Sequence, residues 1–397
     1  MIHIDDKTKC CGCTACASIC PKTCINMRPD EEGFLYPVVD ESSCVDCHLC
    51  EKVCPVINKK VNENKLPESC AVRAKDGDTV MNSTSGGFFT PFANWLKNNN
   101  GVICAAAYDE DFHVSHVIVD TTKEEIPYNR IRGSKYVQSD MRDCYVKIKE
   151  FLSHGRIVGF VGTTCQVAGL KAYIGDNDNL ITIDLVCHGT PSPKLWDKYL
   201  EYQKDKNKSE IKDISFRNKT YGYHSSTMKI DFENGNEYYG SARIDYMLKS
   251  FFKEISSRPI CYECPFKTIE RCSDVTLYDC WHIAELVPEL KDDDRGYTNV
   301  IVQSEKGKKL LEELKEELNI YPVDTKKAVE LDGIMVEHAA VPHPRRAEYY
   351  KNIDNVSLHD HIQTFIPVSK KDYVLERTKG VLHRTGILRI IKRILKK

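Results

Sequence analysis

The chain has 397 residues, of which 41% are apolar and 29% charged, and its formal net charge is −2 at pH 7. This balance is typical of a globular protein with more than one domain, and it does not favour a nucleic-acid binder. No stretch reaches the roughly 20 apolar residues of a membrane span. Nineteen cysteines, with no signal peptide ahead of them, predict a cytoplasmic, reducing and anaerobic setting, because exposed thiolates oxidise.

Two cysteine runs of the form C-x2-C-x2-C-x3-C-P open the chain. Three thiolates at two-residue gaps wrap one corner of an iron–sulfur cube, whereas zinc usually takes CxxC pairs from separate knuckles. We therefore predict two [4Fe–4S] clusters, in which the last cysteine of each run binds the cluster of the other run. The predicted ligand sets are Cys10, Cys13, Cys16 and Cys54 for one cluster, and Cys44, Cys47, Cys50 and Cys20 for the other.

A polar run from Asn58 to Lys65 predicts a linker, with a domain boundary near residues 58–68. Beyond it, short apolar strands alternate with helical stretches, a pattern that predicts an α/β body. The predicted strands are residues 70–74, 102–108, 114–119, 157–161, 180–186 and 298–305, and the predicted helices are residues 88–98, 141–153, 166–174, 195–202 and 306–318.

Polar loops at strand and helix ends are candidate ligand sites. The loop of Ser85, Gly86 and Gly87 precedes a helix and offers backbone N–H groups to a phosphate, although an ordinary N-cap turn explains it equally well. A second loop, residues 133–136, offers the cation of Lys135, for which the alternative is a solvated side chain.

A third loop joins a predicted strand to a predicted helix through Gly162, Thr163, Cys165 and Gln166. Such a junction suits an anion or the edge of a cofactor ring. Cys165 is interpreted as a packed thiol in preference to a redox thiol, because free cysteines at helix starts are usually packed.

A second cysteine constellation lies in the body. Cys187 ends an apolar strand, Cys261 and Cys264 form a CxxC-P motif, and Cys272 follows eight residues later. Four thiolates of this kind predict a third [4Fe–4S] cluster, with structural zinc as the alternative. His188 is a candidate acid or base, although a histidine there can simply orient the neighbouring sulfur. The remaining cysteines, Cys11, Cys24, Cys70, Cys104, Cys144 and Cys280, are interpreted as core or incidental residues.

Over roughly residues 1–345 the chain resembles the coenzyme F420 hydrogenase/dehydrogenase beta-subunit family, preceded by a 2[4Fe–4S] ferredoxin-type domain. The stretches that carry the resemblance are residues 83–88, 133–139, 160–170, 184–193 and 258–281. Thr164 stands where the family usually has proline, and residues 278–282 replace a Gly-Asp-Phe-Trp-Gly run.

The resemblance implies an iron–sulfur flavoprotein that passes electrons between clusters and FAD, and from there to or from F420 or another small hydride acceptor. It places FAD near the loops of residues 85–87 and 162–166, with Lys135 and His188 as candidate contacts, and the third cluster on Cys187, Cys261, Cys264 and Cys272. The expected partner is a ferredoxin or another oxidoreductase subunit. The alternatives are a non-enzymatic electron-transfer adaptor and a zinc-stabilised binding protein.

The predicted architecture is α+β or α/β, with a small ferredoxin-like domain, a mixed α/β flavin-binding body and a basic C-terminal helix. The predicted domains are residues 1–60, 68–175, 176–345 and a tail of residues 346–397. Residues 380–397 contain no acidic side chain. Ile387, Leu388, Ile391, Ile394 and Leu395 share one helical face, opposite Arg389, Lys392, Arg393 and Lys396. This pattern is typical of a helix on an anionic membrane, and docking on the protein's own body is the alternative.

Overall fold

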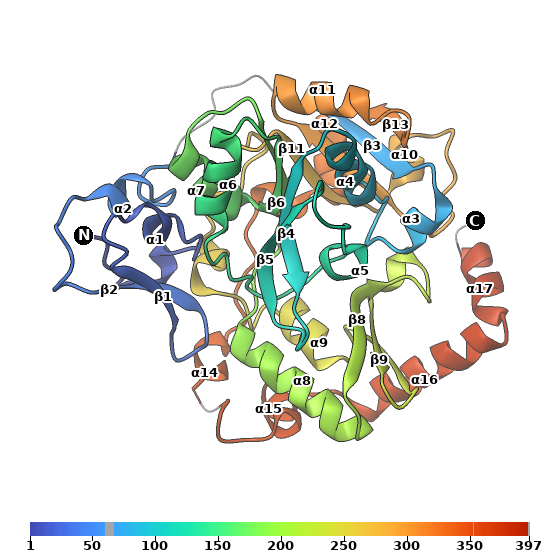
Figure 1. The fold of residues 1–397 in the computed structure, drawn as a ribbon. Helices are drawn as coiled ribbons and strands as arrows, with labels where there is room; N and C mark the ends of the chain where they lie inside the picture. Colours follow the sequence, from blue (N-terminus) through green and yellow to red (C-terminus); the bar gives the residue numbers. More distant parts are fainter. Residues whose placement is uncertain (60–66, 352, 396–397) are drawn as a thin grey trace. The chain divides into compact units, whose positions relative to one another are not determined.

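The computed structural model describes residues 1–59, 67–351 and 353–395 (Figure 1). Most of the predicted linker, residues 60–66, and the last two residues of the predicted basic helix lie outside them. The chain forms two compact units, one of Met1–Pro193 with Ser257–Val341 and one of Lys194–Ser256 with Pro342–Lys397. Among the described residues, no helix is both long enough and apolar enough to cross a membrane.

The head, residues 1–59 of the first unit, is built on one antiparallel hairpin, β1 (Ile25–Pro29) and β2 (Leu35–Val39). The cysteine loops wind through left-handed backbone at matching places. Gly12 and Thr14 have φ of 71°, and Asp46 and His48, 34 positions later, have φ of 51° and 56°. The repeat in the sequence is therefore also a repeat in the backbone. The helical turns are η1 (Lys7–Lys9), α1 (Ala15–Ile19) and α2 (Leu49–Lys52).

The body of the first unit is an eight-stranded mixed sheet with the order β13-β3-β12-β11-β7-β6-β4-β5. The four central strands, β11, β7, β6 and β4, are parallel to their neighbours within that group, and the pairs outside it are antiparallel. The strands are β3 (Glu68–Ala74), β4 (Val102–Tyr108), β5 (Val114–Asp120), β6 (Val158–Thr163), β7 (Leu180–Leu185), β11 (Val275–Cys280), β12 (Tyr297–Val302) and β13 (Leu318–Val323).

Two apolar layers belong to this sheet. One contains Phe92 and Leu96 of α4, packed with sheet residues such as Ile183, and the other contains Tyr145 of α6 and Leu170 of α7. Burial of such side chains stabilises each layer by roughly 1.5–3 kcal/mol per residue. The helices are α3 (Gly77–Met81), α4 (Phe89–Asn98), α5 (Tyr128–Ile131), α6 (Cys144–Ser153), α7 (Thr164–Ile174), η3 (Pro259–Glu263), α10 (Ile283–Leu286), α11 (Glu305–Glu313), α12 (Thr325–Asp332) and α13 (Ile334–Glu337).

The predicted fold class is confirmed, because a small cysteine-rich head precedes a mixed α/β body with strands at all the predicted places. One predicted element is wrong in extent. The helix expected over residues 306–318 ends at Glu313, and Leu318 begins β13. The reason is tertiary, since Leu318 pairs with Ala74 of β3 at the edge of the sheet and is buried there.

The second unit contains the three-stranded antiparallel sheet β10-β9-β8. Its core stacks Trp196 on Tyr199 and Phe216, and the buried Asp245 caps a helix and accepts a 2.5 Å hydrogen bond from the Tyr199 hydroxyl. The strands are β8 (Ile211–Asn218), β9 (Thr227–Phe232) and β10 (Glu237–Ser241), and the helices are α8 (Pro193–Asn207), η2 (Tyr223–Ser225), α9 (Tyr246–Phe252), α14 (Arg346–Tyr349), α15 (Leu358–Phe365), α16 (Lys370–Arg384) and α17 (Ile387–Leu395).

Candidate functional site

The carboxyl ends of β6 and β7 bring two cysteines together. Thr163 and Leu185, the last residues of these parallel strands, pair with each other in the sheet. Each chain segment then runs two residues beyond its strand to a cysteine, Cys165 in one case and Cys187 in the other. This edge is where open α/β sheets place their ligands.

A cavity at this edge, here called the body cavity, is lined by four cysteines from three separate segments of the body and by Cys11 of the head. Cys165 comes from the start of α7, Cys187 from the end of β7, and Cys261 and Cys264 from η3 and the residue after it. Burial is the main cause that raises the pKa of Cys187, Cys261 and Cys264, and the charge of Cys165 adds to the rise in each case. Cys165 is therefore the thiol close to all three. The other lining residues are Cys11, Thr163, Thr164, His188, Gly189, Thr190, Arg258, Ile260, Phe266, Lys267 and Arg271.

Cys272, predicted as the fourth ligand, is not among the residues that line the body cavity. Burial raises its pKa to about 11, and its charged neighbours are Asp184, Lys171 and Arg271. The three cysteines predicted to accompany it meet at the cavity without it, and Cys165, interpreted from the sequence as a packed thiol, meets them there.

A buried ion pair fixes the segment that carries Cys272. Arg271 and Asp184 are 1% and 0% exposed in their side chains, and Arg271 Nη1 lies 2.7 Å from Asp184 Oδ2. The carboxylate of Asp184 also accepts hydrogen bonds from Thr164 at 2.5 Å and Ser273 at 2.7 Å. Thr164, which stands where the family usually has proline, thus ties the start of α7 to β7. A buried pair with every oxygen engaged holds its segments in one arrangement.

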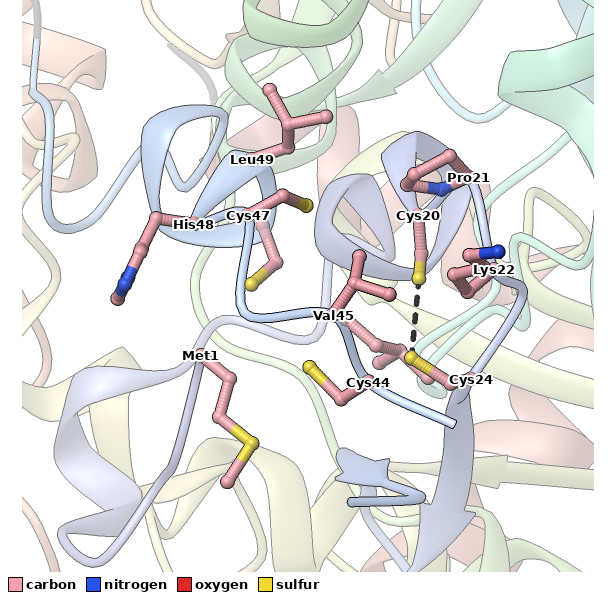
Figure 2. Close-up of a pocket in the computed structure, with 12 residues that line it drawn as sticks. Met1, Cys20, Pro21, Lys22, Cys24, Cys44, Val45, Cys47, His48 and Leu49 are labelled. Carbon is pink, nitrogen blue, oxygen red and sulfur yellow. Dashed lines mark hydrogen bonds between the residues drawn. The ribbon is translucent and has the colours of Figure 1, made fainter. Parts of the chain in front are cut away.

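The head contains a second cavity, the head cavity, shown in Figure 2. It is lined by the predicted set Cys20, Cys44, Cys47 and Cys50, and also by Cys24, whose Sγ lies 3.3 Å from that of Cys20. Two backbone N–H groups point at these sulfurs, from Ile2 to Cys50 at 3.3 Å and from Asp46 to Cys44 at 3.4 Å. N–H donors to cysteine sulfur are a normal part of iron–sulfur sites.

The other predicted head set, Cys10, Cys13, Cys16 and Cys54, is also brought together. Burial raises the pKa of Cys16 to about 12, and the charges of Cys10 and Cys54 add to the rise. Burial also raises the pKa of Cys13, and the charge of Cys16 adds to that rise. The last cysteine of the second run therefore lies with the first run, as the cross-over pattern predicts. Cys13, Cys16 and Cys54 are buried, whereas Cys47 of the head cavity is exposed.

The head contacts the body at the first cysteine run. Cys11, within the first run, lines the body cavity together with Cys165, so the first cysteine run reaches this cavity. Gly169 of α7 packs so closely on the head that a Cβ there would lie 2.8 Å from Cys13 Sγ. Only glycine leaves room for this approach. No sequence pattern indicated Cys11 as a site residue, because its place at the body cavity depends on how the head packs against the body.

The loops predicted to hold a flavin lie near one another. Thr84 Oγ1 accepts a 3.0 Å hydrogen bond from the backbone N–H of Ser134, which joins the first loop to the second. Gly86 N–H already donates to Thr298 Oγ1 at 2.9 Å, and Ser85 Oγ lies 2.7 Å from the same oxygen. These two residues therefore fasten the loop to β12.

Lys135 lies in this region as a half-buried cation. Its Nζ is 5.1 Å from the centre of the Tyr108 ring and donates to the carbonyls of Arg132 and Gly133 at 3.3 Å. Burial lowers its pKa to about 7. Within the described residues no carboxylate forms an ion pair with Lys135, which suits it to an anionic ligand.

The junction after β6 has a clear local role. Gln166 Oε1 accepts a 2.9 Å hydrogen bond from the backbone N–H of Thr163, which caps the start of α7. Gln166 thus positions Thr163 and Cys165 at the body cavity. His188 is half-buried and lines the same cavity, next to Cys187.

The donor sets fit iron–sulfur clusters by their chemistry. Each proposed site offers four thiols, Cys47 alone among the twelve is exposed, and the resemblance and the spacing both predict four-iron cubes. In the described part of the chain, no group of three or more His, Cys, Asp or Glu side chains is arranged to hold a single metal ion. A cube places its thiolates on separate iron atoms, so its ligands are spaced more widely than those of one ion.

Comparison with known proteins identifies two regions of the chain. The model for the C terminus of the coenzyme F420 hydrogenase/dehydrogenase beta subunit matches residues 155–327, and the model described as 4Fe-4S dicluster domain matches residues 9–58. A chain in a xenon-derivatised F420-reducing [NiFe] hydrogenase complex from Methanosarcina barkeri is 16% identical, with 77% of this chain and 95% of that chain covered and a TM-score of 0.44. No curated protein matches. Residues 9–58 are a 4Fe-4S dicluster domain, and residues 155–327 belong to the coenzyme F420 hydrogenase/dehydrogenase beta-subunit family.

Proposed function

We propose that the chain is an iron–sulfur flavoprotein oxidoreductase that passes electrons between [4Fe–4S] clusters and FAD, and from there to or from F420 or another small hydride acceptor. The observation that carries this proposal is that Cys11 of the first head run lines the body cavity together with Cys165, which brings the head cysteines to that cavity. When bound, the clusters supply one-electron steps and the flavin combines two of them into a hydride transfer.

Three ligand sets follow from the described contacts. The head sets are Cys10, Cys13, Cys16 and Cys54, and Cys20, Cys44, Cys47 and Cys50. The body set is Cys165, Cys187, Cys261 and Cys264, with Cys165 in the place that the sequence pattern assigns to Cys272. Cys165 is preferred over Cys11 as the fourth ligand because it stands on the same sheet edge as Cys187, where Thr163 pairs with Leu185, whereas Cys11 belongs to the first head run.

The flavin part of the proposal is supported by Lys135 and by the joined loops of residues 83–87 and 133–136. A half-buried cation that lacks a carboxylate partner among the described residues suits a phosphate or an anionic ring position. His188 is retained as the candidate acid or base, because it lines the body cavity and lies within residues 184–193, one of the stretches that carry the family resemblance.

Electrons enter or leave the chain at the head cavity in this proposal. Cys47 is exposed, and exposed Val45 and His48 stand beside it at the opening. A ferredoxin or another oxidoreductase subunit would dock there, because electron transfer between proteins needs the donor and acceptor centres to come close.

Anaerobic reduction followed by substrate addition tests the proposal. The dithionite-reduced chain, freed of excess reductant, is mixed with F420 or with a nicotinamide while the flavin absorbance is followed. We expect the flavin to be reoxidised by at least one such acceptor. Bound flavin that none of these acceptors or cell-extract fractions reoxidises would contradict a hydride-transferring enzyme.

The second candidate is a non-enzymatic electron-transfer adaptor between a ferredoxin pool and a partner enzyme. The exposed side of the head cavity favours it, because that feature alone suffices for docking and electron exchange. It is distinguished by cofactor content. A chain with iron and no flavin absorbance band would support the adaptor, whereas bound FAD supports the enzyme.

We further propose that the chain works in the cytoplasm and that residues 380–397 make a peripheral contact with an anionic membrane. Ile387 and Ile390 of α17 are 44% and 58% exposed, while Lys392 donates to Tyr221 O and to Ser225 Oγ within the same unit. Flotation with anionic vesicles compares the full chain with one ending at Arg384. Vesicle binding should be lost with the segment, and equal behaviour of both proteins would favour docking on the protein itself.

A further inference from the structure

Arg258 lies at the junction between the first head cysteine set and the body cavity. Its side chain is buried, with 1% exposed, and it stands immediately before η3. Nε donates to Cys10 O at 2.8 Å, Nη1 to Leu35 O at 3.0 Å, and Nη2 to Cys10 Sγ at 3.5 Å. The guanidinium also lies 3.8 Å from the centre of the Tyr36 ring. Its geometry is therefore fixed from several sides.

The charge of Arg258 has no carboxylate partner among the described residues. A buried cation is costly unless negative charge lies near it. The groups beside Arg258 that can carry such charge are thiols. Cys10 is one of them, because Arg258 Nη2 lies 3.5 Å from its Sγ. Cys165 is another, because it lines the body cavity together with Arg258.

The negative charge that balances this arginine thus comes from thiolates on both sides of it, in the first head set and in the body set. Cys10 belongs to the first head set, and Cys165 belongs to the body set, whose cavity Arg258 also lines. A thiolate-bound iron cluster is negatively charged and gains one further negative charge when it is reduced. A fixed cation hydrogen-bonded to a ligand sulfur in a poorly hydrated place favours the more negative form.

We propose that Arg258 is a positioning residue that acts as the shared counter-charge of the two cysteine sets and raises the reduction potential of the cluster on Cys10, Cys13, Cys16 and Cys54. This inference rests on the proposed function, since it assumes that both sets bind clusters. It makes the innermost head cluster easier to reduce than the cluster of the exposed head cavity. Electrons that enter at Cys47 are thereby drawn toward the body.

The test is an anaerobic redox titration of the full chain with dithionite, followed by electron spin resonance. In Arg258→Gln we expect unchanged iron content and a lower midpoint potential for the innermost head cluster. The midpoint of the cluster on Cys20, Cys44, Cys47 and Cys50 should not move, and it serves as an internal control. An unshifted innermost midpoint in a variant with full iron content would overturn the inference.

Gln138 offers a matched control for the docking of the head. Its Oε1 accepts a 3.0 Å hydrogen bond from the backbone N–H of Leu35, the residue whose carbonyl Arg258 also holds. Gln138→Ala removes a neutral contact at the same junction and should leave the midpoint at the wild-type value. If Gln138→Ala lowers the midpoint as much as Arg258→Gln, the effect is one of docking and the inference fails.

Arg258→His provides a test of charge that does not depend on the glutamine variant. Its midpoint should fall relative to wild type as the pH rises through the ordinary histidine pKa, because the positive charge is lost in that range. A pH profile parallel to that of the wild type would contradict the inference. If the wild type itself gives no cluster signal, the proposed function has failed, and that outcome is distinct from a wild-type signal that Arg258 does not affect.

Discussion

The head cavity and the body cavity each contain four cysteine thiols that could bind iron, but the two sets have different surroundings. In the head cavity Cys47 is exposed, and the ligands come from two short loops within residues 20–50. In the body cavity the four proposed ligands come from three separate segments, and the side chains of Arg258, Lys267 and Arg271 line the same space. The head site is thus accessible and locally built, whereas the body site is shielded and depends on the fold.

Because their surroundings differ, we expect the head site and the body site to have different tasks. An exposed site can exchange electrons with a docking partner, and a shielded site beside cations can hold an electron close to the carboxyl edge of the sheet. Lys267 shows how the fold builds the second kind of site. Its Nζ donates to the carbonyls of Cys187 at 2.5 Å and Met335 at 2.7 Å, so two backbone carbonyls hold the cation beside a proposed ligand.

The largest effect is expected from Cys165→Ser. If Cys165 is the fourth ligand of the body set, the variant should lose roughly four iron atoms per chain, the content of one cube. Both head signals should persist, because their ligands are untouched. Iron and sulfide analysis after anaerobic purification measures this.

Cys272→Ser is the matched control, because this cysteine also lies in the body but outside the cavity. It should keep its full iron content. The opposite result, with iron lost in Cys272→Ser and retained in Cys165→Ser, would return the fourth position to Cys272.

The second prediction concerns the buried ion pair that stabilises the structure around the body cavity. Asp184→Asn leaves the buried Arg271 without its counter-charge and should lower the free energy of unfolding by about 3–5 kcal/mol. Anaerobic urea unfolding followed by circular dichroism measures the loss. Asp293→Asn is the control, since Asp293 pairs with Arg73 and is 42% exposed, so its loss should stay below about 1 kcal/mol. Equal losses in both variants would show that the buried network does not support the body.

The third prediction concerns pH and the sheet beneath the body cavity. His116 is buried, its Nδ1 lies 2.7 Å from Ser139 Oγ and its Nε2 3.1 Å from Val161 O. Burial lowers its pKa from 6.5 to about 4. The unfolded chain therefore binds a proton at higher pH than the folded chain. Stability is complete above pH 6.5 and falls by about 3 kcal/mol as the pH drops toward 4.

His116→Gln should remove this part of the pH dependence, which thermal unfolding between neutral and mildly acidic pH would show. The difference between the two proteins isolates His116 from the acid sensitivity of bound clusters. Parallel profiles for wild type and variant would mean that His116 does not carry the effect.

The smallest expected effect is on flavin binding. Lys135→Met should weaken the binding of FAD about 10-fold, since a hydrogen bond from a charged group contributes about 1.5–3 kcal/mol. Fluorescence titration of the flavin-free protein with FAD gives the change. Lys123→Met is the control, because that lysine is 77% exposed on another loop and should leave the affinity unaltered. An unchanged affinity in Lys135→Met would remove this residue from the flavin site.

The head was predictable from sequence because its ligands follow one another within short loops. The spacing of Cys10, Cys13 and Cys16 indicates three thiolates around one cluster, and the 34-residue repeat indicates the second set of cysteines. The proposed body set was only partly predictable, because Cys165, Cys187 and Cys261 meet only when parallel strands lie side by side. One signal was present, since two predicted strands are each followed closely by a cysteine.

Cys272 was predicted as a ligand because it is close in sequence to Cys264, and its neighbour Arg271 lines the body cavity while Cys272 does not. Arg258 begins one of the stretches that carry the family resemblance, residues 258–281, but no sequence pattern indicated its contacts. Its partners are backbone carbonyls and a thiol more than 200 positions away, which no local pattern records.

The most direct test of the proposed function is the iron, zinc, sulfide and flavin content of the unaltered chain after anaerobic purification. Three clusters and a flavin predict roughly twelve iron atoms with as many sulfides, about four of each per cluster, together with bound FAD and no zinc. Roughly eight iron atoms accompanied by zinc and no flavin would contradict the proposal, because the body cavity would then be a structural site.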